Sequence, residues 1–167
     1  SFALNYYFGE LNVFGYHLVN IIIHIINGIL IWWLVNLTFK TPVMQRMPVS
    51  PQASSLIALA ASLIFITHPI QTQAVTYIVQ RFASLATLFY LLSIVLFVRW
   101  RLSSGSGYRV ALYLFSLLSV VLAMKTKEMS FTLPFIILLY EFFFFRDRLR
   151  KVYFLIPYLL TLLIIPL

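Results

Sequence analysis

The segment FGYHLVNIIIHIINGILIWWLVNLTF, which runs from Phe14 to Phe39, decides the class of fold to which this chain belongs. The segment contains no charged residue, and the nearest charges are Glu10 before it and Lys40 after it. A helix needs about 20 mostly apolar residues to cross the hydrocarbon core of a bilayer. The segment is long and apolar enough for that, so it predicts a transmembrane helix.

The composition of the whole chain also indicates a location in a bilayer. Of its 167 residues, 62% are hydrophobic and 10% are charged, whereas soluble domains carry about 25% charged residues. This balance excludes a soluble enzyme or binding module. The formal net charge is +8, but the basic residues form short clusters between apolar runs, which argues against nucleic-acid binding. The chain has no cysteine, so disulfides and cysteine-bound metals are excluded.

Apolar stretches bounded by charges or helix breakers predict an all-α, polytopic bundle with six membrane spans. A break is expected at His68–Pro69, because proline removes an amide donor and biases the residue before it away from helical geometry. After this break, residues 70–80 are expected to form a short, more polar helix that lies near the membrane surface or caps the bundle. The predicted spans cover about 14–39, 54–67, 82–98, 108–124, 129–145 and 152–167, the last of them cut off by the end of the sequence.

The distribution of Lys and Arg between the predicted connections gives the orientation of the bundle, because cytoplasmic connections collect basic residues. One side would carry nine of them, at positions 40, 46, 99, 101, 109, 146, 148, 150 and 151. The other side would carry Arg81, Lys125 and Lys127. We therefore expect the N-terminal segment, residues 68–81 and residues 125–128 to share the non-cytoplasmic face and to converge there on one site.

Four polar residues of the first span lie on one helical face, because they are spaced three, four and three residues apart: His17, Asn20, His24 and Asn27. Such a stripe does not face lipid. One interpretation is hydrogen bonding to neighbouring helices. The other is a polar wall that lines a substrate cavity. A metal site at His17 and His24 is disfavoured, because two helical turns separate their rings by about 10 Å.

Arg81 follows a long charge-free stretch that begins at Met47. A guanidinium at a membrane edge needs a phosphate, a carboxylate or water to satisfy its donors. Two interpretations are open: Arg81 binds a phosphate, or it reaches the interface or pairs with Glu128 without a function of its own.

Lys125, Lys127 and Glu128 form a charged cluster at the end of the fourth predicted span. Two ammonium groups at a helix end are suited to hold a lipid-linked phosphate. Glu128 is either a general base or an ion-pair partner of Lys127. For Glu141, which lies inside an apolar run, we expect an ion pair with an arginine of the cluster from Arg146 to Arg150.

Three stretches carry a resemblance to a known family. They are NYYFGELNVFGYHLVNIIIHIIN from Asn5, HPIQTQAVTYIVQRFASLATLFYLLS from His68, and KEMSFTLPFIILLYEFFFF from Lys127. Together, in this order, they resemble the multispanning membrane proteins with C-terminal tetratricopeptide repeats that are related to the protein O-mannosyltransferases and share the GT-C glycosyltransferase fold.

This resemblance implies transfer of a sugar from a polyprenyl-phosphate donor to a Ser or Thr of an acceptor protein on the periplasmic or luminal face. It implies no cofactor beyond the lipid-linked sugar and leaves a divalent metal open. A larger membrane complex and a bacterial inner membrane are further expectations. The catalytic acid is expected in a first outer loop outside residues 1–167, as are the tetratricopeptide repeats.

Carried over by position, the resemblance assigns contacts with the donor phosphate and sugar to Arg81, Lys127 and Glu128, and the cavity wall to His17 and His24. We add Lys125 to the donor-binding group as the second ammonium group of its cluster, and we predict that Asn20, Asn27, His68 and Gln80 also line the cavity. Two other functions stay open at this point: a non-catalytic membrane scaffold or accessory subunit, and a transporter whose pathway the polar stripe would line.

Overall fold

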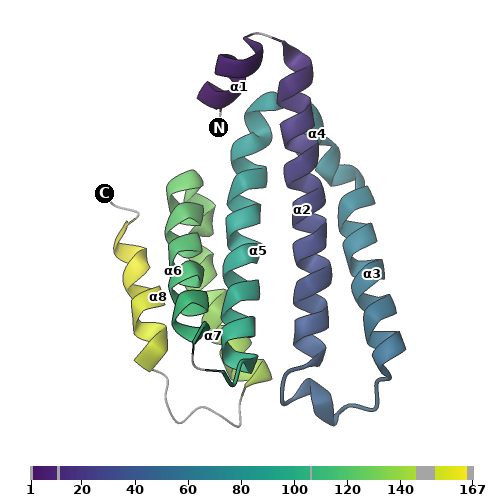
Figure 1. Ribbon diagram of the computed structural model, residues 1–167, viewed down its shortest axis with the longest axis vertical. Coiled ribbons are helices and arrows are strands. Elements are labelled where there is room, and N and C mark those ends of the chain that lie inside the picture. Colours follow the sequence, from purple (N-terminus) through teal and green to yellow (C-terminus); the bar gives the residue numbers. More distant parts are fainter. Residues whose placement is uncertain (1, 11, 106, 146–152, 165–167) are drawn as a thin grey trace.

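The long helix predicted from the sequence is present and lies between α3 (Pro51–Thr67) and α5 (Arg81–Leu102), as Figure 1 shows. The computed structural model describes residues 2–10, 12–105, 107–145 and 153–164. In it, α2 runs from Val13 to Phe39. Asn12 caps its start, because the Asn12 side chain accepts a hydrogen bond from the amide of Phe14 at 3.0 Å. A short helix, α1 (Phe2–Gly9), precedes α2 and folds back beside its first turns (Figure 1).

The helix after α2 breaks where the sequence predicts. α3 spans Pro51–Thr67, with the Ser50 side chain as its N-cap and Pro51 in its first turn. His68 is extended, and the chain then turns by 50° into short helical pieces. These pieces are a 3₁₀ turn at Pro69–Gln71, α4 at Thr72–Thr76 and a second 3₁₀ turn at Ile78–Gln80.

Four further helices complete the bundle: α5 (Arg81–Leu102), α6 (Arg109–Thr126), α7 (Leu133–Phe144) and α8 (Ile156–Leu160). The most extensive helix contacts are those of α5 with α6 and of α2 with α5 and α3. Figure 1 shows α3, α2, α5 and α6 side by side, with α8 beyond α6. Short connections make consecutive long helices antiparallel, so α1, α4 and the start of α5 lie at one end (Figure 1).

The described residues contain three helices that are individually long and apolar enough to cross a membrane: Val13–Phe39, Ile78–Leu102 and Arg109–Thr126. The pair Pro51–Thr67 and Pro69–Thr76 qualifies as a fourth, bent span. The three individual helices overlap the predicted spans 14–39, 82–98 and 108–124. The bent pair combines the predicted span 54–67 with part of the segment 70–80, for which a separate helix was expected.

The predicted fifth span, 129–145, differs from the structure. Residues Glu128–Thr132 form a 3₁₀ turn, and α7 has only 12 residues, about 18 Å of helix, which is short of the hydrocarbon thickness of about 30 Å. Pro134 lies in the first turn of α7, where a missing amide donor is tolerated but upstream α-helix is disfavoured. Of the predicted sixth span, residues 153–164 are described as α8 between two 3₁₀ turns, and residues 152 and 165–167 lie outside the described part.

A buried ion pair joins α5 to α7 within the apolar core. Arg101 Nε donates to one carboxylate oxygen of Glu141 at 2.8 Å, and Arg101 Nη2 donates to the other at 2.5 Å. The Arg101 guanidinium also lies 4.8 Å from the ring centre of Phe145 and 5.1 Å from that of Phe154. The expected partner of Glu141 is therefore replaced by a residue forty positions upstream, and the cluster from Arg146 to Arg150 lies outside the described residues.

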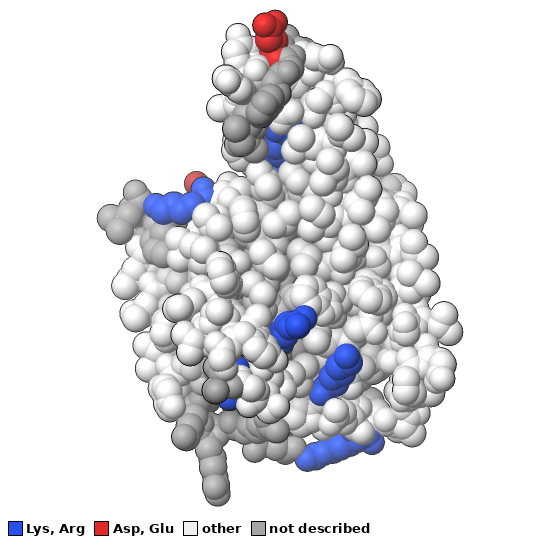
Figure 2. Space-filling model, in the orientation of Figure 1, with Lys and Arg blue, Asp and Glu red and all other residues white. Residues whose placement is uncertain are grey.

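Charged side chains are rare on the surface of the bundle and unevenly distributed. Figure 2 shows a face that is mostly free of Lys, Arg, Asp and Glu. On this face, several basic side chains gather toward the lower end, and acidic side chains appear only in the upper half. The end formed by the C-terminus of α5 and the N-terminus of α6 carries Arg99, Arg101 and Arg109.

Helices α2 and α3 approach closely at Gly28. The Ser62 hydroxyl donates to the Gly28 carbonyl at 2.8 Å. A Cβ placed on Gly28 would lie 2.6 Å from Cγ1 of Ile66 and still nearer to its Cδ1. Any larger residue at this position would force the Ile66 side chain to move, so glycine favours the close packing of the two helices, as at other helix contacts in membranes.

We expect Gly28→Val to destabilise the bundle by about 1–3 kcal/mol, because the added side chain overpacks the contact with α3. The measurement is the midpoint of thermal unfolding of the purified protein in detergent. Combining Gly28→Val with Ile66→Ala removes the obstructing atoms and should restore part of the loss. Equal losses in the single and double variants would contradict this account of the contact.

Candidate functional site

The start of α5 is the place where three segments distant in sequence meet. Arg81, the first residue of α5, contacts α1 and α2. The first three turns of the same helix, from Ala83 to Leu91, line a pocket together with Lys127, Met129 and Ser130. The N-terminal segment, residues 68–81 and residues 125–128 thus border one short stretch of helix.

The Arg81 side chain is fully buried, with 0% of its surface exposed. Its Nε donates to Asn20 Oδ1 at 2.8 Å, its Nη1 to Asn5 Oδ1 at 2.7 Å, and its Nη2 to the Tyr16 carbonyl at 2.8 Å. The guanidinium also lies 5.5 Å from the centre of the Tyr16 ring. These contacts join α5 to both N-terminal helices.

This environment changes the interpretation of Arg81. Each of the three guanidinium nitrogens donates a hydrogen bond to an acceptor within the protein. Because the side chain is not exposed, it presents no donor to a phosphate, in contrast to the prediction. The enclosed Arg81 side chain also does not extend to the membrane interface or pair with Glu128. We assign Arg81 to holding the helices together.

The polar stripe on α2 donates to backbone carbonyls of the segments packed against it. His17 Nδ1 lies 3.4 Å from the Val75 carbonyl, and His24 Nε2 lies 3.1 Å from that of Ile66. A carbonyl can only accept, so these nitrogens carry the proton. The Asn20 amide donates to the Tyr77 carbonyl at 3.4 Å, and the Asn27 amide to that of Ser84 at 3.1 Å.

Of the two interpretations of the stripe, interhelical hydrogen bonding accounts for Asn20 and Asn27. Both side chains are buried, at 0% and 2% exposure, so they face neighbouring helices and not an open cavity. His17 is half-buried. The two histidines bond to carbonyls of different segments, and the described residues contain no group of three or more His, Asp or Glu that could hold a metal ion.

His24 and His68 come together in a pocket of about 260 Å³ where α3 breaks. His24 is the lining residue from α2, and the rest of the wall comes from the end of α3, the α3–α4 connection and α4, with Gln71, Thr72 and Thr76 among its polar residues. His68 is exposed, and its Nδ1 accepts the amide of Ile70 at 3.2 Å. Gln80, also predicted to line a cavity, is exposed at the last position before α5.

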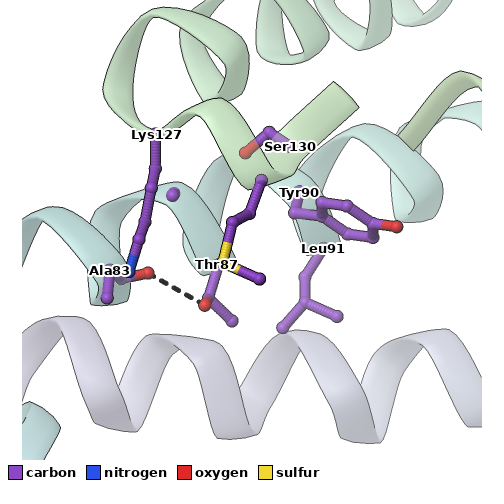
Figure 3. Close-up of a pocket in the computed structure, with 8 residues that line it drawn as sticks. Ala83, Thr87, Tyr90, Leu91, Lys127 and Ser130 are labelled. Atoms are coloured by element: carbon purple, nitrogen blue, oxygen red, sulfur yellow. Dashed lines mark hydrogen bonds between the residues drawn. The ribbon is translucent and has the colours of Figure 1, made fainter. Parts of the chain in front are cut away.

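A second pocket, of about 290 Å³, lies between α5 and the turn after α6. Figure 3 shows the Lys127 side chain extending from this turn toward Ala83 and Thr87 of α5. The hydroxyl of Thr87 donates to the Ala83 carbonyl at 2.9 Å. The complete lining consists of Ala83, Ala86, Thr87, Tyr90, Leu91, Lys127, Met129 and Ser130.

An adjoining, more polar pocket contains the remaining predicted donor-binding residues. Lys125, Lys127 and Glu128 all line it, and Lys127 and Met129 belong to both pockets. All three charged side chains are exposed. Within the described residues, neither Lys127 nor Glu128 forms an ion pair, since the pair found there is Arg101 with Glu141. The cationic groups are therefore available to an anionic ligand.

The chemistry of these joined pockets favours an anionic group attached to an apolar body. Two ammonium groups stand at one side, and hydroxyl groups of Thr87, Tyr90 and Ser130 add hydrogen-bonding capacity. Leu91, Ala86 and Met129 provide an apolar wall. The pocket between α5 and the turn after α6 shares no lining residue with the pocket that contains His24 and His68.

Sequence reasoning found the charged residues of this site but not its α5 wall. Ala83, Ala86, Thr87, Tyr90 and Leu91 follow the three- and four-residue spacing of a single helical face. The small side chains of Ala83 and Ala86 and the hydroxyl groups of Thr87 and Tyr90 could have indicated a pocket wall. This indication was weaker than the apolar pattern of the surrounding residues.

The chain resembles curated proteins over most of its length. It is 32% identical over 148 residues to protein O-mannosyl-transferase tmtc2 of Xenopus laevis, a match that covers 87% of this chain and 16% of that protein. It is 32% identical over 143 residues to protein O-mannosyl-transferase TMTC3 of Homo sapiens, covering 86% of this chain and 14% of the relative. A match to human TMTC4, at 31% identity, covers 79% and 18% respectively.

The chain thus spans less than a fifth of the length of these relatives. The relatives are animal proteins, so they give no support to the expected bacterial inner membrane. No family model and no solved structure matches the chain. These three relatives, at about 30% identity over most of the residues of this chain, are all named as protein O-mannosyl-transferases. Over most of its length, the chain is therefore similar to one part of the TMTC protein O-mannosyl-transferases.

Proposed function

We propose that this chain is the donor-binding membrane portion of a protein O-mannosyl-transferase that uses a polyprenyl-phosphate sugar. The observation that carries the proposal is the direction of Lys127, whose side chain extends into the pocket beside α5 (Figure 3). Lys125 stands beside it at the end of α6. An ammonium group in a largely apolar pocket suits a phosphate that is attached to a long hydrocarbon.

In the proposed reaction, the oxygen of an acceptor Ser or Thr attacks the anomeric carbon of the donor sugar. The bond from this carbon to the phosphate oxygen breaks, and polyprenyl phosphate leaves with the electron pair. A carboxylate, expected in the first outer loop outside residues 1–167, acts as the base that takes the hydroxyl proton. Lys127 binds the phosphate and stabilises the negative charge that develops on the leaving group.

The proposed site lies at the end of the bundle that carries few basic residues, and the prediction from charge distribution makes this the periplasmic or luminal side. A donor whose phosphate lies near the interface and whose prenyl chain lies in the bilayer can approach this pocket from the membrane. The acceptor protein approaches from the aqueous side, where Lys125 and Glu128 are exposed.

The test is a transfer assay with the full-length protein in proteoliposomes, using polyprenyl-phosphate mannose and an acceptor polypeptide. We expect Lys127→Gln to lower the transfer rate about 10- to 100-fold, as removal of one charge-assisted contact of about 1.5–3 kcal/mol predicts. Lys125 lines only the adjoining, more polar pocket, so Lys125→Gln should lower the transfer rate less.

Lys40→Gln is the matched control, because Lys40 is an exposed lysine just after α2, at the opposite end of the bundle. It should leave the rate unchanged. Full activity of the Lys127→Gln variant would overturn the donor-site assignment. Absence of transfer by the unaltered protein with any polyprenyl-phosphate sugar would favour the scaffold function instead.

A further inference from the structure

A fourth pocket, of about 520 Å³, lies at the opposite end of the bundle from the proposed donor site. It opens between the end of α5, the start of α6 and the turn before α8. Aromatic rings form most of its wall. The ring centre of Trp100 lies 5.0 Å from that of Tyr113 and 4.9 Å from that of Phe154. We call this the aromatic groove.

One cation, Arg109, lines the aromatic groove. Its guanidinium lies 5.9 Å from the centre of the Trp100 ring. Its Nε is buried and has no hydrogen-bond partner among the described residues. A buried donor without an acceptor is costly, so this position favours a ligand that brings an acceptor, and a negatively charged one above all.

The neighbouring Arg101 shows the contrast. Arg101 donates to both carboxylate oxygens of Glu141, which balances its charge inside the core. Within the described residues no acid pairs with Arg109. Among the residues that the structure describes, the charge of Arg109 is therefore unbalanced, while that of Arg101 is balanced by Glu141.

The outer rim of the groove faces away from the bundle. Val110 and Tyr153, which lie on this rim, are 66% and 65% exposed. On a membrane-spanning bundle, apolar side chains exposed in this way contact lipid. The groove lies where basic residues cluster near a helix end, a position that suits anionic head groups.

We propose that the aromatic groove binds one anionic glycerophospholipid of the adjoining leaflet. The phosphate lies against Arg109, and an acyl chain lies along Trp100, Tyr113 and Phe154. A zwitterionic phospholipid carries a compensating cation in its head group and gains less from Arg109. The site is separate from the transfer reaction and does not depend on it.

The experiment uses the full-length protein in phosphatidylcholine nanodiscs that contain a phosphatidylglycerol analogue with a photoreactive acyl chain. After illumination, the labelled peptides are mapped by mass spectrometry. We expect label on residues 109–113 and 153–157. Added phosphatidylglycerol should compete with this labelling, and the same amount of phosphatidylcholine should not.

Three variants separate a specific site from general attraction to anionic lipid. Arg109→Gln should lower labelling of the groove about tenfold, the factor for a loss of about 1.4 kcal/mol. Arg99→Gln is the matched control, since Arg99 is exposed at the same end and lies over the Trp33 ring of α2, at 5.2 Å. Val110→Trp fills the groove without a change of charge and should also lower labelling.

Arg109 is half-buried and Val110 is exposed, so neither variant should shift the unfolding midpoint, and that midpoint is the folding control. Equal effects of Arg99→Gln and Arg109→Gln would overturn the proposal, because only bulk charge would then matter. An unlabelled groove in the unaltered protein would overturn it too and would point to a protein segment as its cover. Competition by phosphatidylcholine as strong as that by phosphatidylglycerol would remove the requirement for an anionic lipid.

Discussion

Glu141→Gln is expected to lower the free energy of unfolding by about 3–5 kcal/mol, the range for removal of one partner from a buried ion pair. Glutamine has nearly the shape of glutamate but not its charge, so Arg101 keeps a positive charge with no carboxylate to balance it. The side chains of Glu141 and Arg101 are 1% and 10% exposed, and water gives little compensation. The measurement is the midpoint of thermal unfolding in detergent, converted to free energy with a denaturant series.

The matched control is the double variant Arg101→Met with Glu141→Leu. It replaces the pair by apolar side chains of similar volume, and such replacements are often neutral or stabilising. We therefore expect the double variant to unfold near the temperature of the unaltered protein. If it is as unstable as Glu141→Gln, the loss comes from packing around Phe145 and Phe154 and not from an unpaired charge.

Arg81→Met is expected to cost about 3 kcal/mol or more, because hydrogen bonds to a charged group contribute about 1.5–3 kcal/mol each. The substitution leaves the side-chain oxygens of Asn5 and Asn20 and the Tyr16 carbonyl without their donors. We expect a lower unfolding midpoint and faster hydrogen exchange of the amides of α1. Exchange measured by mass spectrometry separates the loss in α1 from loosening of the whole bundle.

Asn5→Ala serves as the partial variant for this experiment. Asn5 accepts from Arg81 and donates to the Gly15 carbonyl at 3.0 Å, so its removal frees α1 but keeps the bonds of Arg81 to α2. We expect rapid exchange in α1 with a small change of midpoint. An Arg81→Met variant with normal exchange and an unchanged midpoint would contradict the role assigned to Arg81, and would reopen its predicted contact with phosphate.

The sequence was sufficient where local chemistry decides the structure. The apolar run of α2, its cap at Asn12 and the break at His68–Pro69 each depend on residues adjacent in the chain. The face shared by His17, Asn20, His24 and Asn27 follows from helical spacing alone. The position of Lys127 at the end of a helix was also readable.

The partners of charged residues were not readable from the sequence. The donors of Arg81 find acceptors 61 to 76 positions upstream, and Glu141 finds Arg101 forty positions away. Which of several compatible groups meet depends on how the helices cross and on the length of each turn. The sequence also did not predict that α7 would be short. The apolar run from 129 to 145 does not show that the α-helix begins only next to Pro134.

The break between α3 and α4 explains why α2 carries a polar stripe. In an unbroken helix, the carbonyl of Ile66 would accept the amide of Ile70, but that amide is bonded to the His68 side chain. His24 supplies the missing donor from a different helix. The Val75 and Tyr77 carbonyls, next to the end of α4, lie within reach of His17 and Asn20 in the same way.

In a solvent that offers no hydrogen bonds, an interrupted helix is tolerated only where another part of the protein satisfies the freed groups. The stripe on α2 and the interruption after Thr67 therefore depend on each other. A chain in which Pro69 gave way to a continuous helix would leave the histidines of α2 without acceptors. A chain without those histidines would leave the carbonyls of Ile66 and Val75 without the hydrogen-bond donors that α2 now supplies.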